Sequence, residues 1–349
     1  MNLLKSCFLL PVLIHQLHGQ PVHFKNIPID TNYSLRGLSV VDDSVAWVSG
    51  IKGVVGKSTN GENNWTFAQV KGFEKSDFRS LYAFNANEAV IANAGSPANI
   101  LRTKDGGKSW EIVYTNNDSL AFFDGVDFWN DKEGIIYGDP IKGRMLLLKT
   151  IDGGKTWQEL PEESRPEMAE GEASFAASGT GIRCHGRSKV IIATGGKVSK
   201  LLVSNDYGIR WEPVKTPILQ GKSSTGIFSV AYTENDSLGD WRPKIIVVGG
   251  DYTNDTLKKN HVLYATHLTA TGILFREPAR PTGGYRECVE FLGGSHLAIA
   301  VGPGGTDITK DGGILWDSVG QKGFHVIRKA RKGKLVIAAG SKRISVVSP

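Results

Sequence analysis

The sequence predicts an all-β protein, a seven-bladed β-propeller with four-stranded blades. Three observations support this prediction: many short runs rich in Val and Ile, an excess of glycine over proline, and an octapeptide that recurs along the chain. Glycine occurs 42 times and proline 14 times in 349 residues, together with eight tryptophans. Glycine-rich turns between short β-branched runs are typical of sheet proteins, so helical folds are disfavoured.

The recurring octapeptide has the form Ser/Thr-x-Asp-x-Gly-x-x-Trp. Four copies keep all the fixed positions: TKDGGKSW at 103–110, TIDGGKTW at 150–157, SNDYGIRW at 204–211 and TKDGGILW at 309–316. A fifth copy, STNGENNW at 58–65, has Asn60 in place of the aspartate and Glu62 in place of the glycine. Self-similarity of this kind along a chain indicates a repeat architecture.

Each octapeptide is expected to close a hairpin between two strands. An aspartate accepts hydrogen bonds from the backbone of its own turn, glycine supplies a positive φ, and tryptophan buries its ring beside the turn. We therefore assign a structural role and no catalytic role to the aspartates and tryptophans of the four complete copies, which are Asp105, Trp110, Asp152, Trp157, Asp206, Trp211, Asp311 and Trp316.

Seven apolar runs end in glycine, and each follows another β-prone run. The glycines are Gly50, Gly95, Gly138, Gly195, Gly250, Gly302 and Gly340, and the preceding runs are 35–41, 78–84, 122–128, 174–182, 227–232, 285–291 and 324–329. Each unit thus supplies an inner strand, a second strand ending in glycine, a third strand leading into the octapeptide, and a fourth starting at the tryptophan. Four-stranded units of about 40–60 residues are propeller blades.

The two ends of the chain are expected to close the ring. The last unit, 323–349, has room for only three strands, and the β-prone residues 22–29 supply the missing outer strand. Closure leaves only short, protected strand edges. We therefore interpret 21–349 as a single propeller domain, and we expect a monomer.

Residues 1–20 resemble a secretory signal peptide. Lys5 precedes an apolar stretch of about nine residues, too short to span a bilayer, and a weakly polar exit follows. We expect the mature chain to have no membrane span and to be extracytoplasmic, either periplasmic or secreted. Its two cysteines, Cys184 and Cys288, fit no metal spacing and lie in non-neighbouring units, so we expect buried free thiols.

Charge and motifs exclude several classes of function. The 41 basic and 35 acidic residues give a net charge of +6, and removal of Lys5 with the leader leaves +5. Basic residues are spread along the chain, whereas nucleic-acid-binding proteins concentrate them, so a nucleic-acid partner is disfavoured. The glycine-rich turn at 302–305 lacks the Lys-Ser/Thr of a phosphate-binding loop, and the histidines are scattered singly. We expect no cofactor and no metal.

The octapeptides resemble the Asp-box, or BNR, repeats of sialidases, sortilin-type receptors and the photosystem II assembly-factor propellers. The resemblance is strongest to the assembly-factor-like group, and it rests on the stretches 35–41, 46–50, 122–124, 138–140, 171–179 and 249–252. It spans nearly the whole mature chain. The resemblance implies the propeller fold, but it transfers no particular activity.

Alignment of the seven inner strands by their distance to the following glycine brings one position of each into register. These residues are Arg36, Arg79, Asp124, Ser174, Phe228, Arg286 and His325, and the adjoining turns add Asp139, Glu172 and Asp251. Inner strands surround the channel of a propeller, so we expect these side chains at its mouth. Guanidinium groups offer paired donors to carboxylate or phosphate, which favours an anionic ligand. A self-satisfied network of ion pairs is the alternative.

We expect a binding or assembly scaffold whose partner is a protein or an anionic small molecule or glycan. The channel mouth and the long loops at 161–171, 236–243 and 251–260 form the expected contact surface.

The enzymatic alternative is a sialidase-like glycoside hydrolase acting on an acidic sugar. Its chemistry would recruit two tyrosines and three acids, which are Tyr252, Tyr285, Glu172, Asp124 and Asp251. Against it, the Arg-Ile-Pro signature of sialidases is absent, because Gly37 follows Arg36, and sialidase propellers have fewer blades than this chain.

Overall fold

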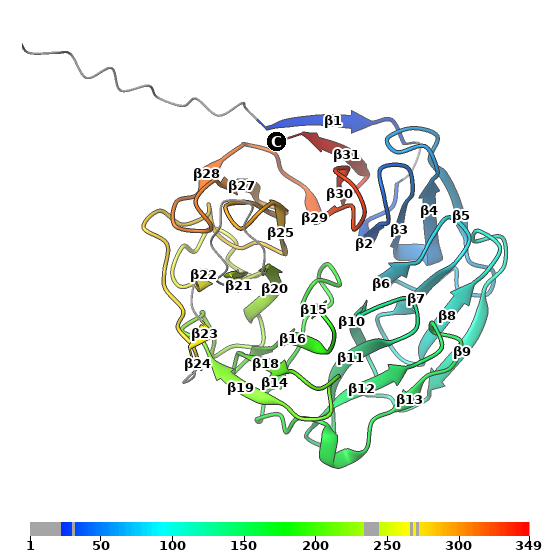
Figure 1. Cartoon of the computed structure of the whole chain (residues 1–349), viewed down its shortest axis with the longest axis horizontal. Coiled ribbons are helices and arrows are strands. Elements are labelled where there is room, and N and C mark those ends of the chain that lie inside the picture. The colour runs from blue at the N-terminus through cyan, green and yellow to red at the C-terminus, as the bar shows by residue number, and fades with distance from the viewer. Residues whose placement is uncertain (1–21, 30–31, 234–243, 266–267, 270–271, 349) are drawn as a thin grey trace, which may run out of the picture.

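The computed structural model describes residues 22–29, 32–233, 244–265, 268–269 and 272–348. Strands in these ranges form a ring of seven blades (Figure 1), and the helices there are two short 3-10 helices, η1 (Ile51–Gly53) and η2 (Glu162–Ser164). The seven-bladed all-β prediction is confirmed. Within the same ranges no helix has the length and apolar character needed to cross a membrane. The expected leader at 1–20 lies outside the described residues.

The first three blades each contain four antiparallel strands in sequence order. Their strands are β2 (Leu35–Val40), β3 (Ala46–Gly50), β4 (Val54–Ser58), β5 (Thr66–Gln69), β6 (Phe78–Ala83), β7 (Ala89–Asn93), β8 (Ala98–Thr103), β9 (Glu111–Asn116), β10 (Phe123–Phe128), β11 (Gly134–Ile141), β12 (Arg144–Thr150) and β13 (Gln158–Glu159). The first strand of each blade lies nearest the axis of the ring (Figure 1).

Blades four to six follow the same plan. Their strands are β15 (Ile182–His185), β16 (Lys189–Ala193), β18 (Lys200–Ser204), β19 (Glu212–Lys215), β20 (Thr225–Thr233), β21 (Lys244–Asp251), β22 (Val262–Ala265), β25 (Cys288–Gly293), β26 (Leu297–Gly302), β27 (Gly305–Thr309) and β28 (Asp317–Ser318). In the fifth blade an isolated bridge between Tyr264 and Arg276 holds the outer position. Two short pairs complete the topology, β14 (Glu172–Ala173) with β17 (Gly195–Gly196) and β23 (Leu268–Thr269) with β24 (Gly272–Ile273).

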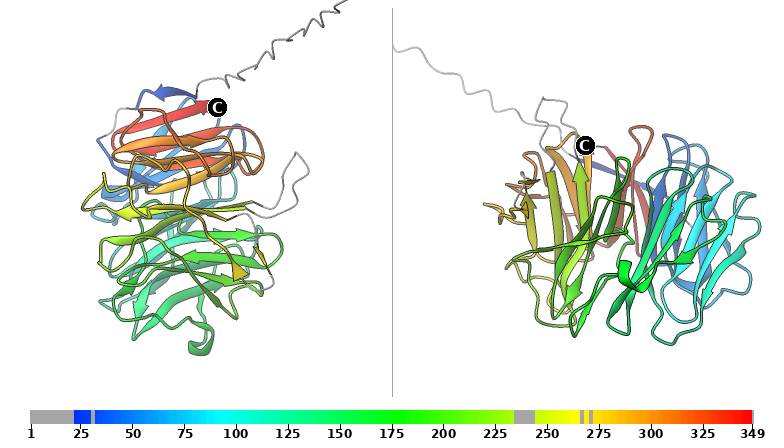
Figure 2. Two further views of the ribbon diagram at one scale, coloured as in Figure 1. Left: turned by 90° about the vertical axis from the view of Figure 1, so that its left-hand side faces the viewer. Right: turned by 60° about the horizontal axis from the view of Figure 1, so that its bottom comes forward.

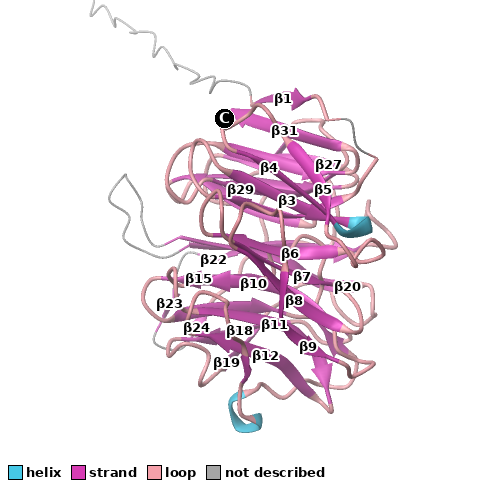
Figure 3. Cartoon of the chain, turned by 90° about the vertical axis from the view of Figure 1, so that its right-hand side faces the viewer, coloured by secondary structure: helices cyan, strands magenta, loops and turns pink. Residues whose placement is uncertain are grey.

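The ends of the chain close the ring, as the sequence predicts. β1 (His23–Ile27) pairs antiparallel with β31 (Arg343–Ser348) and becomes the outer strand of the seventh blade, beside β30 (Val336–Gly340) and β29 (Phe324–Lys329). Figure 1 shows β1 beside β31 near the C-terminus, and the side views in Figures 2 and 3 show the blades as twisted sheets packed face to face.

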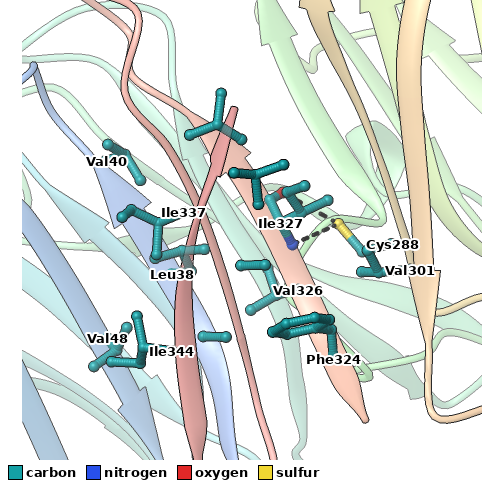
Figure 4. Close-up of a cluster of buried hydrophobic side chains, with 14 of the residues drawn as sticks. Leu38, Val40, Val48, Cys288, Val301, Phe324, Val326, Ile327, Ile337 and Ile344 are labelled. Carbon is teal, nitrogen blue, oxygen red and sulfur yellow. Dashed lines mark hydrogen bonds between the residues drawn. The ribbon is translucent and has the colours of Figure 1, made fainter. Parts of the chain in front are cut away.

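The hydrophobic core lies between neighbouring blades. One cluster joins blades six, seven and one and includes Leu38, Cys288 and Phe324 (Figure 4). Five other clusters join the remaining neighbours in turn. Each buried Val, Leu or Ile contributes about 1.5–3 kcal/mol, so packing of sheet on sheet stabilises the ring. The thiols of Cys288, which is buried, and Cys184, which is half-buried, are both free.

The octapeptide turns contain the hydrogen bonds that their residues favour. Between β12 and β13, Asp152 Oδ1 accepts the N–H groups of Lys155 and Thr156, each at 3.0 Å. The Thr150 hydroxyl accepts the N–H of Gly154 at 2.9 Å, and Gly154 has a φ of +76°. Related hydrogen bonds recur around the other three aspartates, Asp105, Asp206 and Asp311. Two of the four tryptophan rings, Trp157 and Trp316, are buried, and two, Trp110 and Trp211, are half-buried.

The inner strand of the fourth blade corrects the sequence analysis. We predicted it at 174–182, whereas β15 begins at Ile182. Residues 174–181, here called the crossing segment, run across the channel, and their Ala177 carbonyl accepts a hydrogen bond from Arg36 of the first blade at 2.7 Å. The small and apolar residues of this segment resemble a strand, but their partners lie on other blades.

The inner strand of the sixth blade starts later than predicted. We expected it at 285–291, and β25 begins at Cys288. Before it, the N–H of Tyr285 bonds to the Asp255 carbonyl and the N–H of Arg286 to the Gly249 carbonyl, both in the fifth blade. These bonds to a neighbouring blade replace the first rungs of the expected ladder.

Candidate functional site

Five inner strands carry a β-bulge at the position that the sequence alignment brought into register. The residue at each bulge is Arg36 in β2, Arg79 in β6, Asp124 in β10, Phe228 in β20 and His325 in β29. A bulge inserts one extra residue and redirects its side chain. The structure therefore places these five predicted residues at equivalent positions around the channel.

In the sixth blade the register residue is Glu287, and Arg286 was a wrong assignment. Cys288 pairs with Val301, the residue before the strand-ending glycine, so that Glu287 takes the position that Arg36 has in the first blade. Arg286 is instead held by Asp307, with Nη2 and Nε at 2.5 and 2.7 Å from Oδ2, and both side chains are buried. Its guanidinium group forms a structural ion pair away from the other arginines.

In the fourth blade Ser174 is not the register residue either. The N–H of Ala193 bonds to the Gly181 carbonyl at 2.8 Å, which places Thr180 at the equivalent position. The Thr180 hydroxyl donates to Ser229 at 2.6 Å, so it links the crossing segment to the fifth blade. Ser174 still reaches the channel mouth, because the crossing segment carries it there.

A cavity of about 510 Å³, here called the channel pocket, lies at this end of the channel. It brings together four of the predicted charged residues, Arg36, Arg79, Asp124 and Asp139, with Ser174 and Phe228. Tyr252 and Tyr285, which the glycosidase alternative named, also line it. The remaining lining residues were not singled out as site residues by the sequence analysis: Phe122, Phe175, Ala176, Ala177, Asp255, Glu287 and Pro303.

Three predicted site residues besides Arg286 do not line the pocket. Glu172 is buried and accepts a hydrogen bond from Lys200 at 3.0 Å. Asp251 is buried and accepts the N–H and hydroxyl of Thr253, within its own turn. His325 lies behind the pocket, where its Nδ1 is 2.6 Å from Glu287 Oε2. Their partners are within the protein, so these three residues are occupied.

The two pocket arginines differ in how many of their donors are used. Arg36 Nη1 donates to the Ala177 carbonyl at 2.7 Å and to Glu287 Oε2 at 3.3 Å. Arg79 Nε donates to Asp77 at 2.7 Å, and no hydrogen bond from its Nη atoms is found within the described residues. The Arg79 side chain is 33% exposed. Arg79 therefore keeps the Nη edge of its guanidinium group for a ligand.

Glu287 organises the internal part of the site. Its Oε2 contacts both Arg36 and His325, its Oε1 accepts a hydrogen bond from the Tyr285 hydroxyl at 3.3 Å, and its side chain is 6% exposed. The predicted alternative was a network of ion pairs that satisfies its own charges. Arg36 fits it in part, because it pairs with Glu287, whereas the Nη groups of Arg79 do not fit it. No sequence signal pointed to Glu287, because its position follows from the pairing of Cys288 with Val301, which the structure shows.

Three acids that line the pocket, Asp124, Asp139 and Asp255, have no cation bonded to them among the described residues. Neither oxygen of Asp124 has a hydrogen-bond partner there, and the residue is fully buried. Burial raises its pKa well above the ordinary value, repulsion from Asp139 adds to the effect, and Arg79 opposes it. Burial also raises the pKa of Asp139, against a hydrogen bond from the Ser174 N–H. Burial without a hydrogen-bond partner thus favours the neutral form of Asp124, whose hydroxyl can donate a hydrogen bond.

Aromatic rings form an apolar part of the pocket lining. Phe175 stacks on Phe228 with ring centroids 3.8 Å apart, and Tyr285 lies edge-on to Phe228 at 4.8 Å. Tyr252 is also edge-on to Phe228, at 6.2 Å, and is half exposed. Rings beside charged groups suit a ligand that has both an anionic group and an apolar part.

The residues that the glycosidase alternative requires are only partly assembled. Tyr252, Tyr285 and Asp124 line the pocket, whereas Glu172 and Asp251 do not. Burial, reinforced by Glu287, raises the pKa of Tyr285 well above the ordinary value, which makes its phenolate form harder to reach. In the part of the chain that the structure describes, no group of three His, Cys, Asp or Glu side chains is placed to hold a metal ion.

The seven blades, the aspartate turns and the pocket at the channel mouth define a BNR-type β-propeller. Within that class the chain resembles one family in particular: residues 18–120 match the family model described as photosynthesis system II assembly factor YCF48. A search of curated proteins finds no match.

Solved structures similar to this chain share its propeller fold. A structure described as YCF48 bound to D1 peptide is 17% identical, with a TM-score of 0.65, and covers 95% of this chain and 97% of its own. YCF48 from Cyanidioschyzon merolae is 18% identical, with a TM-score of 0.63 and coverages of 93% and 99%. The GH74 xyloglucanase from Xanthomonas campestris is 14% identical at a TM-score of 0.56, with 93% of this chain and 53% of the enzyme covered. At these identities the likeness shows the fold alone.

Proposed function

We propose that this protein is an extracytoplasmic scaffold that binds an acidic segment of a partner protein in the channel pocket. The observation that carries this proposal is Arg79, whose guanidinium Nη groups have no partner among the described residues at the mouth of a cavity of about 510 Å³. A similar propeller, YCF48, has been solved with a bound D1 peptide, which supports a peptide as the type of ligand.

The pocket lining suggests how such a segment binds. A carboxylate of the partner pairs with the free Nη groups of Arg79, and Arg36 supplies further positive charge. The Asp124 hydroxyl adds a donor to the same group, and the rings of Phe228 and Tyr252 take an apolar side chain next to it. The loops at 161–171 and 251–260 extend the contact surface. The third expected loop, 236–243, lies outside the described residues.

The extracytoplasmic location rests on the leader-like residues 1–20. If they act as a secretory signal, the protein expressed in its source cells lacks them and is recovered outside the cytoplasm. N-terminal sequencing of the recovered chain tests this, and a start near Gln20 or Pro21 is expected. A chain that keeps Met1 and stays in the cytoplasm would exclude this part of the proposal.

Peptide binding is tested with probes that differ only in one charge. The tetrapeptide Ala-Ala-Ala-Phe with a free carboxylate is compared with its C-terminal amide by isothermal titration calorimetry. We expect the acid to bind at least about tenfold more tightly than the amide, and Arg79→Ala to remove that preference, because a charge-assisted pair is lost. Arg210→Ala, at an exposed arginine in an octapeptide turn, is the matched control and leaves binding unchanged. Equal binding of acid and amide contradicts the proposal.

The glycoside hydrolase remains a second candidate because one of its required pairs is present. The Tyr285 hydroxyl donates to a carboxylate, Glu287, inside the pocket, although not to the predicted Glu172. A fluorogenic sialoside is the probe. Hydrolysis that is lost in Tyr285→Phe would replace the scaffold proposal, and we expect none.

A further inference from the structure

The end of the channel away from the channel pocket contains two more cavities, of about 200 and 260 Å³. Arg36, near the start of β2, lines the channel pocket, whereas Val40, at the end of the same strand, lines the smaller of these cavities. The two cavities adjoin, because four residues line both: Arg183, Tyr232, Glu290 and Lys329. We call them together the second channel site.

Positive charge exceeds negative charge at the second channel site. Among the described residues, four cations line it, Arg183, Arg328, Lys329 and Arg331, against two carboxylates, Asp127 and Glu290. Charges gathered inside a channel are screened less by water than charges on an open surface. The surplus of positive charge therefore attracts an anion to this end of the channel.

The two carboxylates do not neutralise all four cations. Both oxygens of Asp127 accept hydrogen bonds from backbone groups. Oδ2 accepts the N–H of Cys184 at 2.8 Å, and Oδ1 accepts the N–H of Phe128 at 2.9 Å. Glu290 uses one oxygen, Oε2, for both of its ion pairs, with Arg183 at 2.8 Å and Arg328 at 3.4 Å. One carboxylate oxygen thus serves two guanidinium groups.

Two strands that line the second channel site, β15 and β29, each carry a hydrogen-bond donor that is available to a ligand. Arg183, from β15, is 9% exposed, and its Nη1 is buried with no hydrogen-bond partner within the described residues. Lys329, from β29, has no ion pair or hydrogen bond among those residues and is half-buried. A buried guanidinium nitrogen without an acceptor costs free energy, and a bound anion removes that cost.

We propose that the second channel site binds a tetrahedral oxyanion of the phosphate or sulfate type, held by Arg183, Arg328 and Lys329. A guanidinium group presents paired donors that match two oxygens of such an anion, and the lysine adds a point charge. The cavities are smaller than the channel pocket, which favours a compact anion over a peptide. This site is independent of the proposed function, which uses the other end of the channel.

The test is titration of the whole mature chain with sodium sulfate and, separately, sodium phosphate, at constant ionic strength set by chloride. We expect one anion per chain, with a dissociation constant of about 1 mM or lower. Lys329→Met is expected to weaken binding by at least about tenfold, through loss of a charge-assisted contact. Arg183→Lys keeps a cation for Glu290 but removes the free guanidinium nitrogen, and a loss of similar size is expected.

Two controls separate the sites and the sources of the anion. Lys332→Met removes an exposed charge near β29, and Arg79→Ala removes a charge at the other end of the channel, and both are expected to keep anion affinity. Phenyl phosphate distinguishes the two sources of the anion. If the ligand is a phosphate ester on a larger molecule, phenyl phosphate binds as well as phosphate. If the ligand is a free anion, phosphate binds and phenyl phosphate does not. Absence of saturable binding up to about 10 mM, or equal loss in Arg79→Ala, overturns the proposal.

Discussion

Aspartates occupy two regions of this molecule under opposite conditions. In the octapeptide turn, Asp152 accepts two backbone N–H groups and two hydroxyls near the rim of the ring. In the channel pocket, Asp124 is fully buried and accepts none within the described residues. Burial alone would raise the pKa of Asp152, but those hydrogen bonds outweigh it and lower the pKa. Burial raises the pKa of Asp124.

The difference separates residues that hold the fold from residues free to act on a ligand. A carboxylate saturated by its own turn has no capacity left for chemistry. An acid buried without partners destabilises the folded chain. Such groups are rare and cluster at functional sites, so Asp124 is a candidate for contact with a ligand. Four substitutions test this separation, and their expected effects on stability decrease from the first to the last.

Removal of a turn carboxylate should have the largest effect. Asp152→Ala is expected to lower the free energy of unfolding by about 2 kcal/mol at neutral pH. The pKa of Asp152 is lowered in the folded chain, so its contribution is present above the ordinary value of 3.8 and is lost as the pH falls below it. Urea unfolding at pH 7 and pH 3 measures the gap to wild type. A gap of equal size at both pH values contradicts this account.

A channel acid should give the opposite dependence on pH. Burial raises the pKa of Glu290 to about 7 from 4.5, against the opposing charge of Arg183. Its contribution to stability is therefore full below pH 4.5 and is lost as the pH rises towards 7. Glu290→Gln should remove this part of the pH dependence between pH 5 and 7, whatever its effect on absolute stability. If the free energies of unfolding of the variant and the wild type change in parallel between pH 5 and 7, Glu290 is not the source of this pH dependence.

Neutralisation of the pocket acid should stabilise the chain. Asp124→Asn keeps the shape and removes the need to protonate a carboxyl on folding, so we expect a gain of about 1 kcal/mol at pH 7. Because the folded pKa of Asp124 is raised, the gain should vanish below the ordinary value of 3.8. Thermal unfolding at pH 7 and pH 3.5 measures it. Asp118→Asn, at an exposed aspartate, is the control and should change little at either pH.

The incomplete fifth octapeptide should be the least sensitive. The Asn60 side chain has one long hydrogen bond, to the Ser58 hydroxyl at 3.5 Å, and the backbone bonds of this turn do not need it. Asn60→Ala is expected to change the free energy of unfolding by less than about 0.5 kcal/mol. A loss as large as that of Asp152→Ala, measured under the same urea conditions, would show that the aspartate is not what distinguishes the complete turns.

The sequence was informative where neighbouring residues determine structure. Turns such as 150–157 and the strand ending at Gly340 follow from local hydrogen bonding and strand alternation. The crossing segment could not be recognised, because its Ala177 carbonyl bonds to Arg36, a residue 141 positions earlier. Apolar composition alone does not separate such a segment from a strand.

The candidate site was predicted in part for a related reason. Counting from the strand-ending glycine works where the inner strand pairs with the second strand of its own blade on both sides of the same bulge, as for Arg36 and Arg79. In the sixth blade Tyr285 and Arg286 bond to the fifth blade, and the register moves by one residue. A shift of one residue changes the face on which a side chain lies, so Arg286 was chosen in place of Glu287.

The pairing of β1 with β31 has a consequence for how the protein is made. β1 precedes the strands of the first blade, yet its partner is 343–348, which the ribosome synthesises only after all six preceding blades. The seventh blade therefore cannot be completed until residues 343–348 have been synthesised, and until then β1 lacks the partner strand that it has in the fold. Closure of the ring thus depends on residues that are synthesised late. Truncation before Arg343 removes β31, the partner of β1, and leaves the sequence of the first six blades intact.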